Sequence, residues 1–169
     1  MNLFLVRHGT AEPQSPATPD TDRALSSLGQ SETQRLGSYF ASIGMSFSQV
    51  WASPFKRARQ TADNIAKAIR SNDIKLSQNL IPEADPVELA RWLGGLTLED
   101  MEPIVVVGHQ PSMGRAVSEI LGIKYDAITI VPATVVELSF KQQVDGREVL
   151  LASVIPPDRV YSSTFATHT

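Results

Sequence analysis

The sequence predicts an α/β fold with a mostly parallel central sheet and helices on both of its faces. Short apolar runs of strand length alternate with segments whose apolar residues recur at helical spacing, which is typical of parallel sheets. The run Ile104-Val105-Val106-Val107 is β-branched and uninterrupted, as expected for a central strand that is covered on both faces. Two further apolar runs on either side of Asp145-Gly146 predict a late antiparallel hairpin.

The first half of the chain contains signals for three strands and two helices. Ser27 and Gln30 fit a capping box at the start of the first helix, and Gly44 is expected to end it. Ser53 and Pro54 predict the start of the second helix, as a capping residue followed by proline at the first helical position. The predicted elements are a strand at 2–6, a proline-containing loop at 10–23, a helix from 27 to 43, a strand at 50–52, a helix from 54 to 69 and a short strand at 74–76.

The second half of the chain continues the alternation and ends in a hairpin. Asp85-Pro86 opens a helix that is expected to run through Leu93 and to end at Gly94-Gly95. The other predicted elements are a strand at 104–107, a helix from 111 to 121 ended by Gly122, and strands at 133–140 and 148–154. We expect residues 1–157 to form one domain and residues 158–169 to form a polar tail.

Composition narrows the class of protein. With 169 residues, of which 42% are hydrophobic and 20% charged, the chain suits one globular domain with a sizeable core. Its formal net charge of -3 argues against general binding of nucleic acid, so an anion site would need a local cluster of cations. The lack of cysteine excludes disulfides, zinc–thiolate sites and cysteine nucleophiles. No signal peptide or membrane-spanning stretch is recognisable, so we expect a cytoplasmic protein.

Three segments share one arrangement, a strand end followed by a tight turn and then a loop or helix start. They are Arg7-His8-Gly9, Ser53-Pro54-Phe55-Lys56-Arg57 and Gly108-His109-Gln110-Pro111. Because the carboxyl ends of neighbouring parallel strands meet at one edge of a sheet, we expect these segments to converge. Their histidines, arginines and helix N-termini would then bind a phosphoryl group, whose charge is spread over three oxygens in the transition state.

His8 is the candidate nucleophile of this site. A neutral imidazole carries one unprotonated nitrogen, and an acceptor such as a backbone carbonyl near Gly9 would hold the other nitrogen as N–H. Arg7 and Arg57 would bind the phosphoryl oxygens through bidentate hydrogen bonds. His109 would donate to the same oxygens and could become protonated beside a dianion. No metal or cofactor is expected, because no carboxylate cluster accompanies the histidines.

These motifs resemble the signature of the histidine phosphatase superfamily, also called the phosphoglycerate-mutase-like family. The resemblance rests on Arg7-His8-Gly9-Thr10, on the block from Ser53 to Thr61, on Gly108-His109-Gln110-Pro111, and on Asp22-Arg23-Ala24-Leu25-Ser26 followed by Gly29, a segment similar to that of SixA-type phosphohistidine phosphatases. It implies a three-layer α/β/α sandwich over residues 1–155. It also implies that His8 becomes phosphorylated and that water later hydrolyses the phosphohistidine, with the two arginines and His109 forming the phosphate pocket.

The segment that follows the second block bears on the substrate. Many members of the family carry a longer insertion there, with an acidic residue that protonates the leaving oxygen, whereas this chain has Leu80-Ile81-Pro82-Glu83-Ala84-Asp85. Glu83 is the candidate general acid, and Asp85 is expected to cap a helix. An open, shallow site suits a protein-borne phosphohistidine, whose P–N bond breaks more easily than the bond to an alkoxide. We therefore predict a SixA-type phosphatase that acts on phosphohistidine in histidine-phosphotransfer signalling proteins.

Four further residues are candidates for contact with the substrate, namely Gly9, Thr10, Arg23 and Gln110. Gly9 would let the backbone turn sharply and approach the ligand closely. Thr10 would either bind the phosphate or cap the turn. Arg23 would either contact the substrate or form a structural pair with Asp20 or Asp22.

Two other functions stay open on the sequence alone. The chain could be a phosphomonoesterase or mutase of the same superfamily that acts on a small phosphate ester. It could also be a phosphate-binding module without turnover. Lys56 and Arg59 are expected as surface charges that steer an anionic partner, whichever function holds. The pattern predicts no oligomeric state.

Overall fold

The structure is a computed structural model that describes residues 1–71, 73–99, 102–143 and 146–162. The strands are β1 (Asn2–Arg7), β2 (Gln49–Ala52), β3 (Ile74–Leu76), β4 (Ile104–Gly108), β5 (Val135–Gln143) and β6 (Gly146–Ile155). The helices are α1 (Ser27–Ser42), α2 (Lys56–Ala68), α3 (Pro86–Glu99), α4 (Ser112–Leu121) and α5 (Pro157–Ser162), with short 3-10 turns η1 (Asp20–Asp22) and η2 (Gln78–Leu80).

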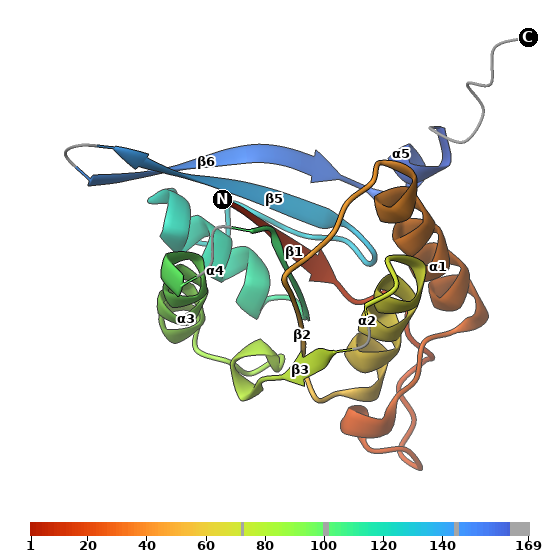
Figure 1. The fold of residues 1–169 in the computed structure, drawn as a ribbon. Coiled ribbons are helices and arrows are strands. Elements are labelled where there is room, and N and C mark those ends of the chain that lie inside the picture. The colour runs from red at the N-terminus through yellow and green to blue at the C-terminus, as the bar shows by residue number, and fades with distance from the viewer. Residues whose placement is uncertain (72, 100–101, 144–145, 163–169) are drawn as a thin grey trace, which may run out of the picture.

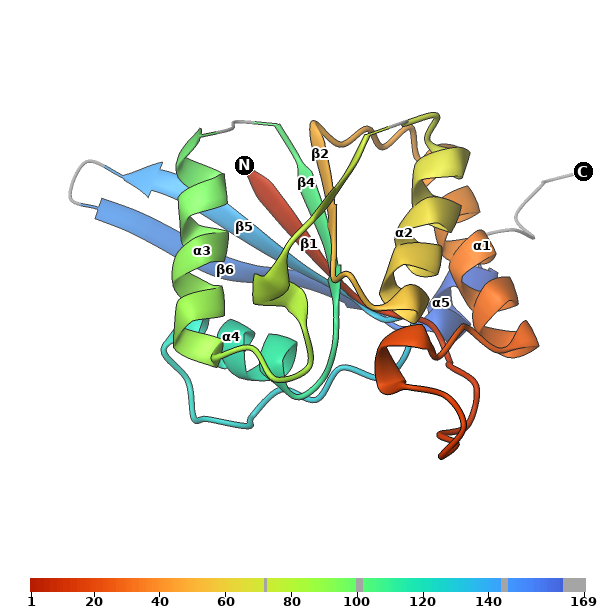
Figure 2. The ribbon, with the colours of Figure 1, turned by 90° about the horizontal axis from the view of Figure 1, so that it is seen from below.

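The elements form three layers. Figure 1 and Figure 2 show α1 and α2 on one face of the sheet and α3 and α4 on the other. The sheet has six strands in the order β3-β2-β4-β1-β5-β6. The predicted α/β/α sandwich is therefore confirmed.

Strand direction and register fix the edge at which the site forms. Strands β3, β2, β4 and β1 are mutually parallel, β5 is antiparallel to β1, and β6 is antiparallel to β5. Arg7 at the end of β1 pairs with Gly108 at the end of β4, and Ala52 at the end of β2 pairs with Val107. The residues that follow β1, β2 and β4 therefore leave the sheet at the same edge, as predicted.

The two faces of β1 contribute to separate apolar cores. Leu3 and Leu5 pack into a cluster with α3 and α4 that includes Leu89. Phe4 packs into a second cluster with α1 and α2, and its ring meets that of Phe40 edge to face at 5.9 Å between centroids. Because successive strand side chains point to opposite faces, the uninterrupted apolar run of β1 serves both cores.

Helix α1 begins at Ser27 as predicted, but its capping residue differs from the prediction by one position. Ser26 is the capping residue, and its hydroxyl accepts the main-chain N–H of Gly29 at 3.1 Å. The prediction of a capping box formed by Ser27 and Gln30 is wrong, because the Gln30 side chain instead accepts a hydrogen bond from Asn64. The Ser26 hydroxyl also donates to the carbonyl of Thr10, which ties the start of α1 to the loop after β1.

Two helix boundaries also differ from the prediction. Helix α2 begins at Lys56 rather than Pro54, and no side chain makes a capping hydrogen bond there. The Ser53 hydroxyl accepts the main-chain N–H of Phe55 at 3.3 Å, just before the helix. Helix α3 runs through Gly94 and Gly95 to Glu99. Each glycine costs a helix about 1 kcal/mol, and burial of residues such as Leu93 on either side outweighs that cost.

The predicted helix end and hairpin of the C-terminal part are found, but an unpredicted helix follows them. Gly122 ends α4 in the left-handed conformation, with φ +62, and the hairpin of β5 and β6 is present. Asp145 of the expected turn lies outside the described residues. Helix α5 contacts α1 (Figure 1) and begins where the polar tail is expected. The domain boundary at residue 157 stays a prediction.

Candidate active site

The three predicted segments meet at one edge of the sheet. His8 follows β1, His109 follows β4, and the centroids of their rings lie 4.8 Å apart. Arg57, in the first turn of α2, donates from Nε to Nε2 of His8 at 3.3 Å. All three side chains are almost fully buried. The predicted convergence of two histidines with a guanidinium is therefore found.

Hydrogen bonds at both ring nitrogens determine the tautomer of His8. Nδ1 lies 2.7 Å from the carbonyl oxygen of Gly9, which can only accept, so Nδ1 carries the proton. The Nε–H of Arg57 can only donate, so Nε2 keeps its lone pair. Burial lowers the pKa of His8 to about 4; the Gly9 carbonyl opposes this shift, and the charge of Arg57 adds to it. His8 is therefore neutral at physiological pH, with its lone pair on Nε2.

His109 is also neutral and presents one nitrogen without a partner. Its Nε2 lies 2.9 Å from the hydroxyl oxygen of Ser53. Its Nδ1 is buried and has no hydrogen-bond partner in the described part of the chain. Burial, together with the neighbouring His8 and Arg57, lowers the pKa of His109 to about 2. If the Ser53 hydroxyl donates to Nε2, then Nδ1 carries the proton and can donate to a bound oxyanion.

The Arg57 guanidinium is held from the opposite side by Asp20. Nη2 of Arg57 lies 2.9 Å from Oδ2 of Asp20, and Nη1 donates to the main-chain oxygen of Asp20 at 2.7 Å. Arg23 pairs with the other carboxylate oxygen of Asp20, at 3.0 Å from Nε. Of the two roles considered for Arg23, the pair with Asp20 is present. Burial lowers the pKa of Arg57, although the hydrogen bond and charge of Asp20 oppose that shift.

Arg7 is positioned by the loop that precedes β5. Its Nη1 donates to the carbonyl oxygen of Ile130 at 2.7 Å, while its buried Nε has no partner among the described residues. The main-chain N–H of Ala133 donates to the carbonyls of Arg7 and His8, and Ala133 adopts a φ of +55 to do so. The positive charge of Arg7 contributes to lowering the pKa of both histidines, as expected for a cation at the same site.

The glycine after His8 is required by packing. A Cβ on Gly9 would lie 2.6 Å from the Thr33 methyl group and 2.9 Å from the carbonyl oxygen of Gly29. The main-chain N–H of Gly9 donates to the Thr61 hydroxyl at 3.2 Å. Close approach to α1 therefore accounts for glycine at this position, and a role for Gly9 in substrate binding stays a prediction.

Thr10 and Gln110 have partners within the protein. The main-chain N–H and the hydroxyl of Thr10 both donate to the carboxylate of Glu32. The side-chain oxygen of Gln110 accepts the main-chain N–H of Gly114 at 2.7 Å, in the first turn of α4. These contacts position the loop after β1 and the start of α4, and direct binding of phosphate by Thr10 or Gln110 stays a prediction.

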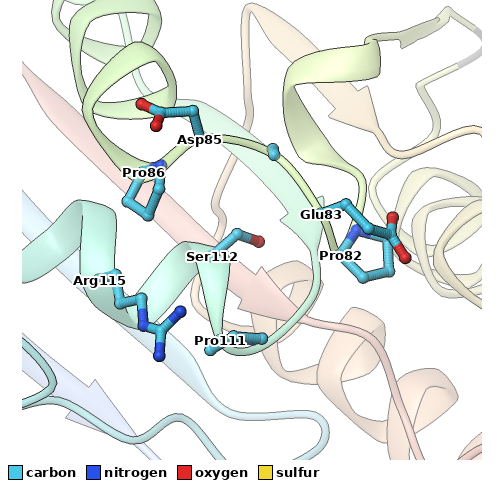
Figure 3. A pocket seen from close by; sticks show the side chains of 8 residues that line it. Pro82, Glu83, Asp85, Pro86, Pro111, Ser112 and Arg115 are labelled. Atoms are coloured by element: carbon cyan, nitrogen blue, oxygen red, sulfur yellow. The ribbon is translucent and has the colours of Figure 1, made fainter.

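Glu83 lies at the rim of the site, beside a pocket of about 280 Å³. Figure 3 shows Glu83 and Arg115 on opposite sides of this pocket, with Ser112 between them. The Glu83 side chain is exposed, and its negative charge opposes the lowering of the Arg57 pKa, which places it near the buried cations. The pocket is lined by Pro82, Glu83, Ala84, Asp85, Pro86, Pro111, Ser112 and Arg115.

Other charged residues have the positions that the sequence predicts. Asp85 caps α3, because its Oδ1 accepts the main-chain N–H groups of Val87 and Glu88, both at 2.9 Å. Lys56 and Arg59 are exposed on α2. Within the described ranges, no group of three or more histidine, aspartate or glutamate side chains could hold a metal ion. Nor is any described helix both long and apolar enough to cross a membrane.

Comparison with known proteins places this geometry in a family. Residues 3–82 match the sequence profile of the histidine phosphatase superfamily, branch 1. An uncharacterised protein of Picosynechococcus sp. is 32% identical over 115 residues, which cover 68% of this chain and 70% of that relative. The chain belongs to the histidine phosphatase superfamily. The resemblance seen in the motifs is confirmed, and this histidine phosphatase is an enzyme of the hydrolase class.

Two further relatives resemble this histidine phosphatase over almost its whole length. A phosphohistidine phosphatase SixA homolog of Haemophilus influenzae is 27% identical over 166 residues, covering 92% of this chain and 97% of the relative. The structure of the protein histidine phosphatase SixA complexed with tungstate superimposes with a TM-score of 0.81 at 20% identity, covering 95% of this chain and 99% of that one. At this identity the superposition shows the fold, and it confirms the phosphoglycerate-mutase-like architecture.

Three residues of the site were missed by reasoning from the sequence. Ser53 was interpreted as a helix cap, although it contacts His109. Asp20 was considered only as a partner of Arg23. The ring of Phe55 contacts the His109 ring at 5.2 Å between centroids and lies 5.1 Å from the Arg57 guanidinium carbon. For Ser53 and Phe55 the sequence does hold a signal, because both lie in the same block as Arg57, from Ser53 to Thr61.

Proposed function

We propose that this histidine phosphatase removes the phosphoryl group from phosphohistidine on a protein, through a covalent intermediate on His8. The observation that carries the proposal is the hydrogen bonding of the His8 ring. The carbonyl of Gly9 and the Nε–H of Arg57 together leave a lone pair on Nε2. Arg7, Arg57 and Nδ1 of His109 then surround the place where a phosphoryl group would meet that nitrogen, and they supply the donors that stabilise its charge.

The first chemical step transfers the phosphoryl group to the enzyme. Nε2 of His8 attacks phosphorus, and the P–N bond of the substrate breaks. Its electron pair returns to the substrate nitrogen, which leaves as a neutral imidazole when the other ring nitrogen carries a proton. The Nε–H of Arg57 must turn from Nε2 to a phosphoryl oxygen during this step. Such a leaving group requires little help from a general acid, which suits the exposed position of Glu83.

The second step releases phosphate. The phosphorylated His8 ring carries a positive charge, because Nδ1 keeps its proton against the carbonyl of Gly9. Water attacks phosphorus, the P–N bond breaks, and the electron pair returns to Nε2. Phosphate leaves with both protons of the water, and His8 returns to its neutral form.

The segment between α2 and β4 supports a protein-borne substrate. In the described part of that segment only β3, η2 and α3 are present, and Glu83 between η2 and α3 is exposed. A site of this kind leaves room for the surface of a second protein beside His8. The relatives named phosphohistidine phosphatase SixA or its homolog point in the same direction. Histidine-phosphotransfer proteins are the class of substrate that we propose.

The pocket beside Glu83 favours a second candidate function. Its volume of about 280 Å³ would accept the organic part of a small phosphate ester (Figure 3). A phosphomonoesterase or mutase of the same superfamily would use such a pocket to hold its substrate. The polar side chains of Glu83 and Arg115 at opposite sides suit a hydroxylated molecule better than an apolar one.

A substrate panel on the wild type and on His8→Ala tests these functions. The panel contains a phosphorylated histidine-phosphotransfer domain, an aryl phosphate and a sugar phosphate. We expect fast hydrolysis of the phosphohistidine, slower hydrolysis of the aryl phosphate, and no activity of His8→Ala. Fast turnover of the sugar phosphate without activity on phosphohistidine would favour the small-molecule enzyme. Binding of phosphate with no hydrolysis of any substrate would favour a module without turnover.

A further inference from the structure

We propose that Asp20 is a positioning residue that holds the Arg57 guanidinium with its Nε–H edge toward His8. The proposal rests on the function proposed above, because it assigns a role in the same reaction. Asp20 lies in the η1 turn, which contacts α2 and which Figure 2 shows near the start of that helix. Its carboxylate belongs to the loop that follows the first histidine motif and is 37 residues from Arg57 in the chain.

The contacts of Asp20 fix the orientation of the Arg57 guanidinium. Asp20 binds both terminal nitrogens of Arg57, Nη2 through the carboxylate at 2.9 Å and Nη1 through the main-chain oxygen at 2.7 Å. The guanidinium is planar and rigid, so fixing its two terminal nitrogens also fixes the direction of Nε–H. That remaining nitrogen lies 3.3 Å from Nε2 of His8. Asp20 and His8 therefore contact opposite parts of one rigid group.

Asp20 is itself held in place. Its second carboxylate oxygen accepts from Nε of Arg23 at 3.0 Å, and Arg23 also donates to the carbonyl of Glu12 at 3.1 Å. The main-chain oxygen of Asp20 accepts the N–H of Arg23 as well, which closes the η1 turn. Both carboxylate oxygens are thus directed by separate guanidinium groups. The position of the loop at 10–23 therefore determines where Asp20 holds the Arg57 guanidinium.

The charge of Asp20 excludes a role as a proton donor. Partial burial alone would raise the pKa of its carboxyl group, but the hydrogen bonds and charges of Arg57 and Arg23 outweigh burial and hold the pKa below its usual value. Asp20 is therefore ionised wherever His8 is neutral, and it cannot protonate a leaving group. The ionised form of a carboxyl group is the one whose oxygens accept hydrogen bonds from the N–H groups of a guanidinium.

A double-mutant cycle separates positioning from a general structural role. The variants are Asp20→Asn, Arg57→Ala and the double variant, assayed for kcat and KM on phosphohistidine and on an aryl phosphate. We expect Asp20→Asn to lower kcat by about tenfold to a hundredfold, the range for losing a hydrogen bond to a charged group. In the Arg57→Ala background the same change should alter kcat by less than about twofold, because nothing is left to position.

The control is Asp22→Asn, in the same η1 turn. Asp22 is exposed, and its contact with the Thr21 hydroxyl is long, at 3.4 Å. This variant should keep the wild-type kcat. In addition, the Arg57 Nε–H resonance should be protected from exchange in the wild type and in Asp22→Asn, and should lose that protection in Asp20→Asn.

Each outcome decides the proposal. Equal losses from Asp20→Asn in the wild-type and Arg57→Ala backgrounds would overturn it, and so would an Arg57 resonance that Asp20→Asn leaves unchanged. Failure of Asp20→Asn to fold, with Asp22→Asn intact, would assign Asp20 a structural role instead. If wild-type protein hydrolyses none of the phosphate substrates, the proposed function fails, and the exchange protection of Arg57 still tests the contact.

Discussion

The Nε–H of Arg57 donates to Nε2 of His8 across 3.3 Å, at the nitrogen that would attack phosphorus. On the other side of the ring, the carbonyl of Gly9 accepts from Nδ1 at 2.7 Å. A group that only donates and a group that only accepts thus select the same tautomer. The free enzyme therefore keeps its nucleophile neutral and oriented, and the cation that protects the lone pair is the one that would afterwards bind the phosphoryl group.

The first prediction concerns the titration of the two histidines. Burial lowers the pKa of His8 to about 4 and that of His109 to about 2, so both rings are neutral above roughly pH 5. As the pH falls through about 4, His8 gains a proton on Nε2 and loses its lone pair. Histidine NMR titration of the free protein, assigned with His8→Ala and His109→Ala, should show no protonation of either ring between pH 5 and pH 8. A midpoint near pH 6.5 for either ring would contradict the described burial.

The second prediction concerns Ser53, which is fully buried against His109. Without its hydroxyl, Nε2 of His109 loses its partner and the proton is free to move from Nδ1. Ser53→Ala should therefore lower kcat roughly tenfold while leaving the fold intact, as measured by steady-state kinetics and circular dichroism. Ser38→Ala is the control, because Ser38 is exposed on α1. Wild-type kcat in Ser53→Ala would show that His109 does not depend on this contact.

The third prediction compares two glycines that both lie in helices. A Cβ on Gly29 in α1 would overlap the carbonyl oxygen of Thr10, whereas a Cβ on Gly94 in α3 would meet nothing within 4 Å. Gly29→Ala should lower the free energy of unfolding by about 1–3 kcal/mol and should also lower kcat, because Thr10 belongs to the loop that follows His8. Gly94→Ala should raise the free energy of unfolding by up to about 1 kcal/mol with unchanged kcat.

Denaturant unfolding of the two glycine variants measures this difference. If both variants had the same stability, the close packing of α1 on the loop after β1 would be wrong. If Gly29→Ala were unstable but fully active, the loop would not be what positions His8.

The fourth prediction concerns Glu83 and the leaving group. Glu83 would protonate an alkoxide, which is a poor leaving group, but a neutral imidazole requires no such proton. Glu83→Gln should therefore lower kcat on an alkyl phosphate by about a hundredfold, the range for general acid catalysis. On phosphohistidine the same variant should lower kcat by no more than about tenfold. Glu88→Gln is the control, because Glu88 is an exposed carboxylate in the first turn of α3. Equal losses on both substrates would assign Glu83 a role in attack by water.

The fold and the main site residues could be predicted because they depend on local patterns. Buried parallel strands are continuous apolar runs, and such a run ends directly before Arg7-His8 and again before Gly108-His109. Once those strands are neighbours, the sheet itself brings their carboxyl ends together. The acceptor for Nδ1 was expected near Gly9 for the same reason, since the neighbouring carbonyl is within reach in any tight turn.

The remaining features depend on contacts between distant parts of the chain. Ser26 and Ser27 are equally suited to cap α1, and the choice is decided by the carbonyl of Thr10, sixteen residues away in the chain. Asp20 and Arg57 are 37 residues apart, and no periodicity connects a loop to the first turn of a helix. Gly94 resembles a helix stop in sequence, but the apolar residues on either side of it bury themselves against the core and extend α3.

Trapping the phosphorylated enzyme tests the central claim most directly. Incubation with a labelled phosphohistidine protein or aryl phosphate, followed by rapid denaturation in alkali, should place one label on Nε2 of His8, because Nδ1 is held as N–H by Gly9. The bound label should be stable to alkali, labile to acid and absent from His8→Ala. An acid-stable label, a label that persists in His8→Ala, or full activity of that variant would contradict the account.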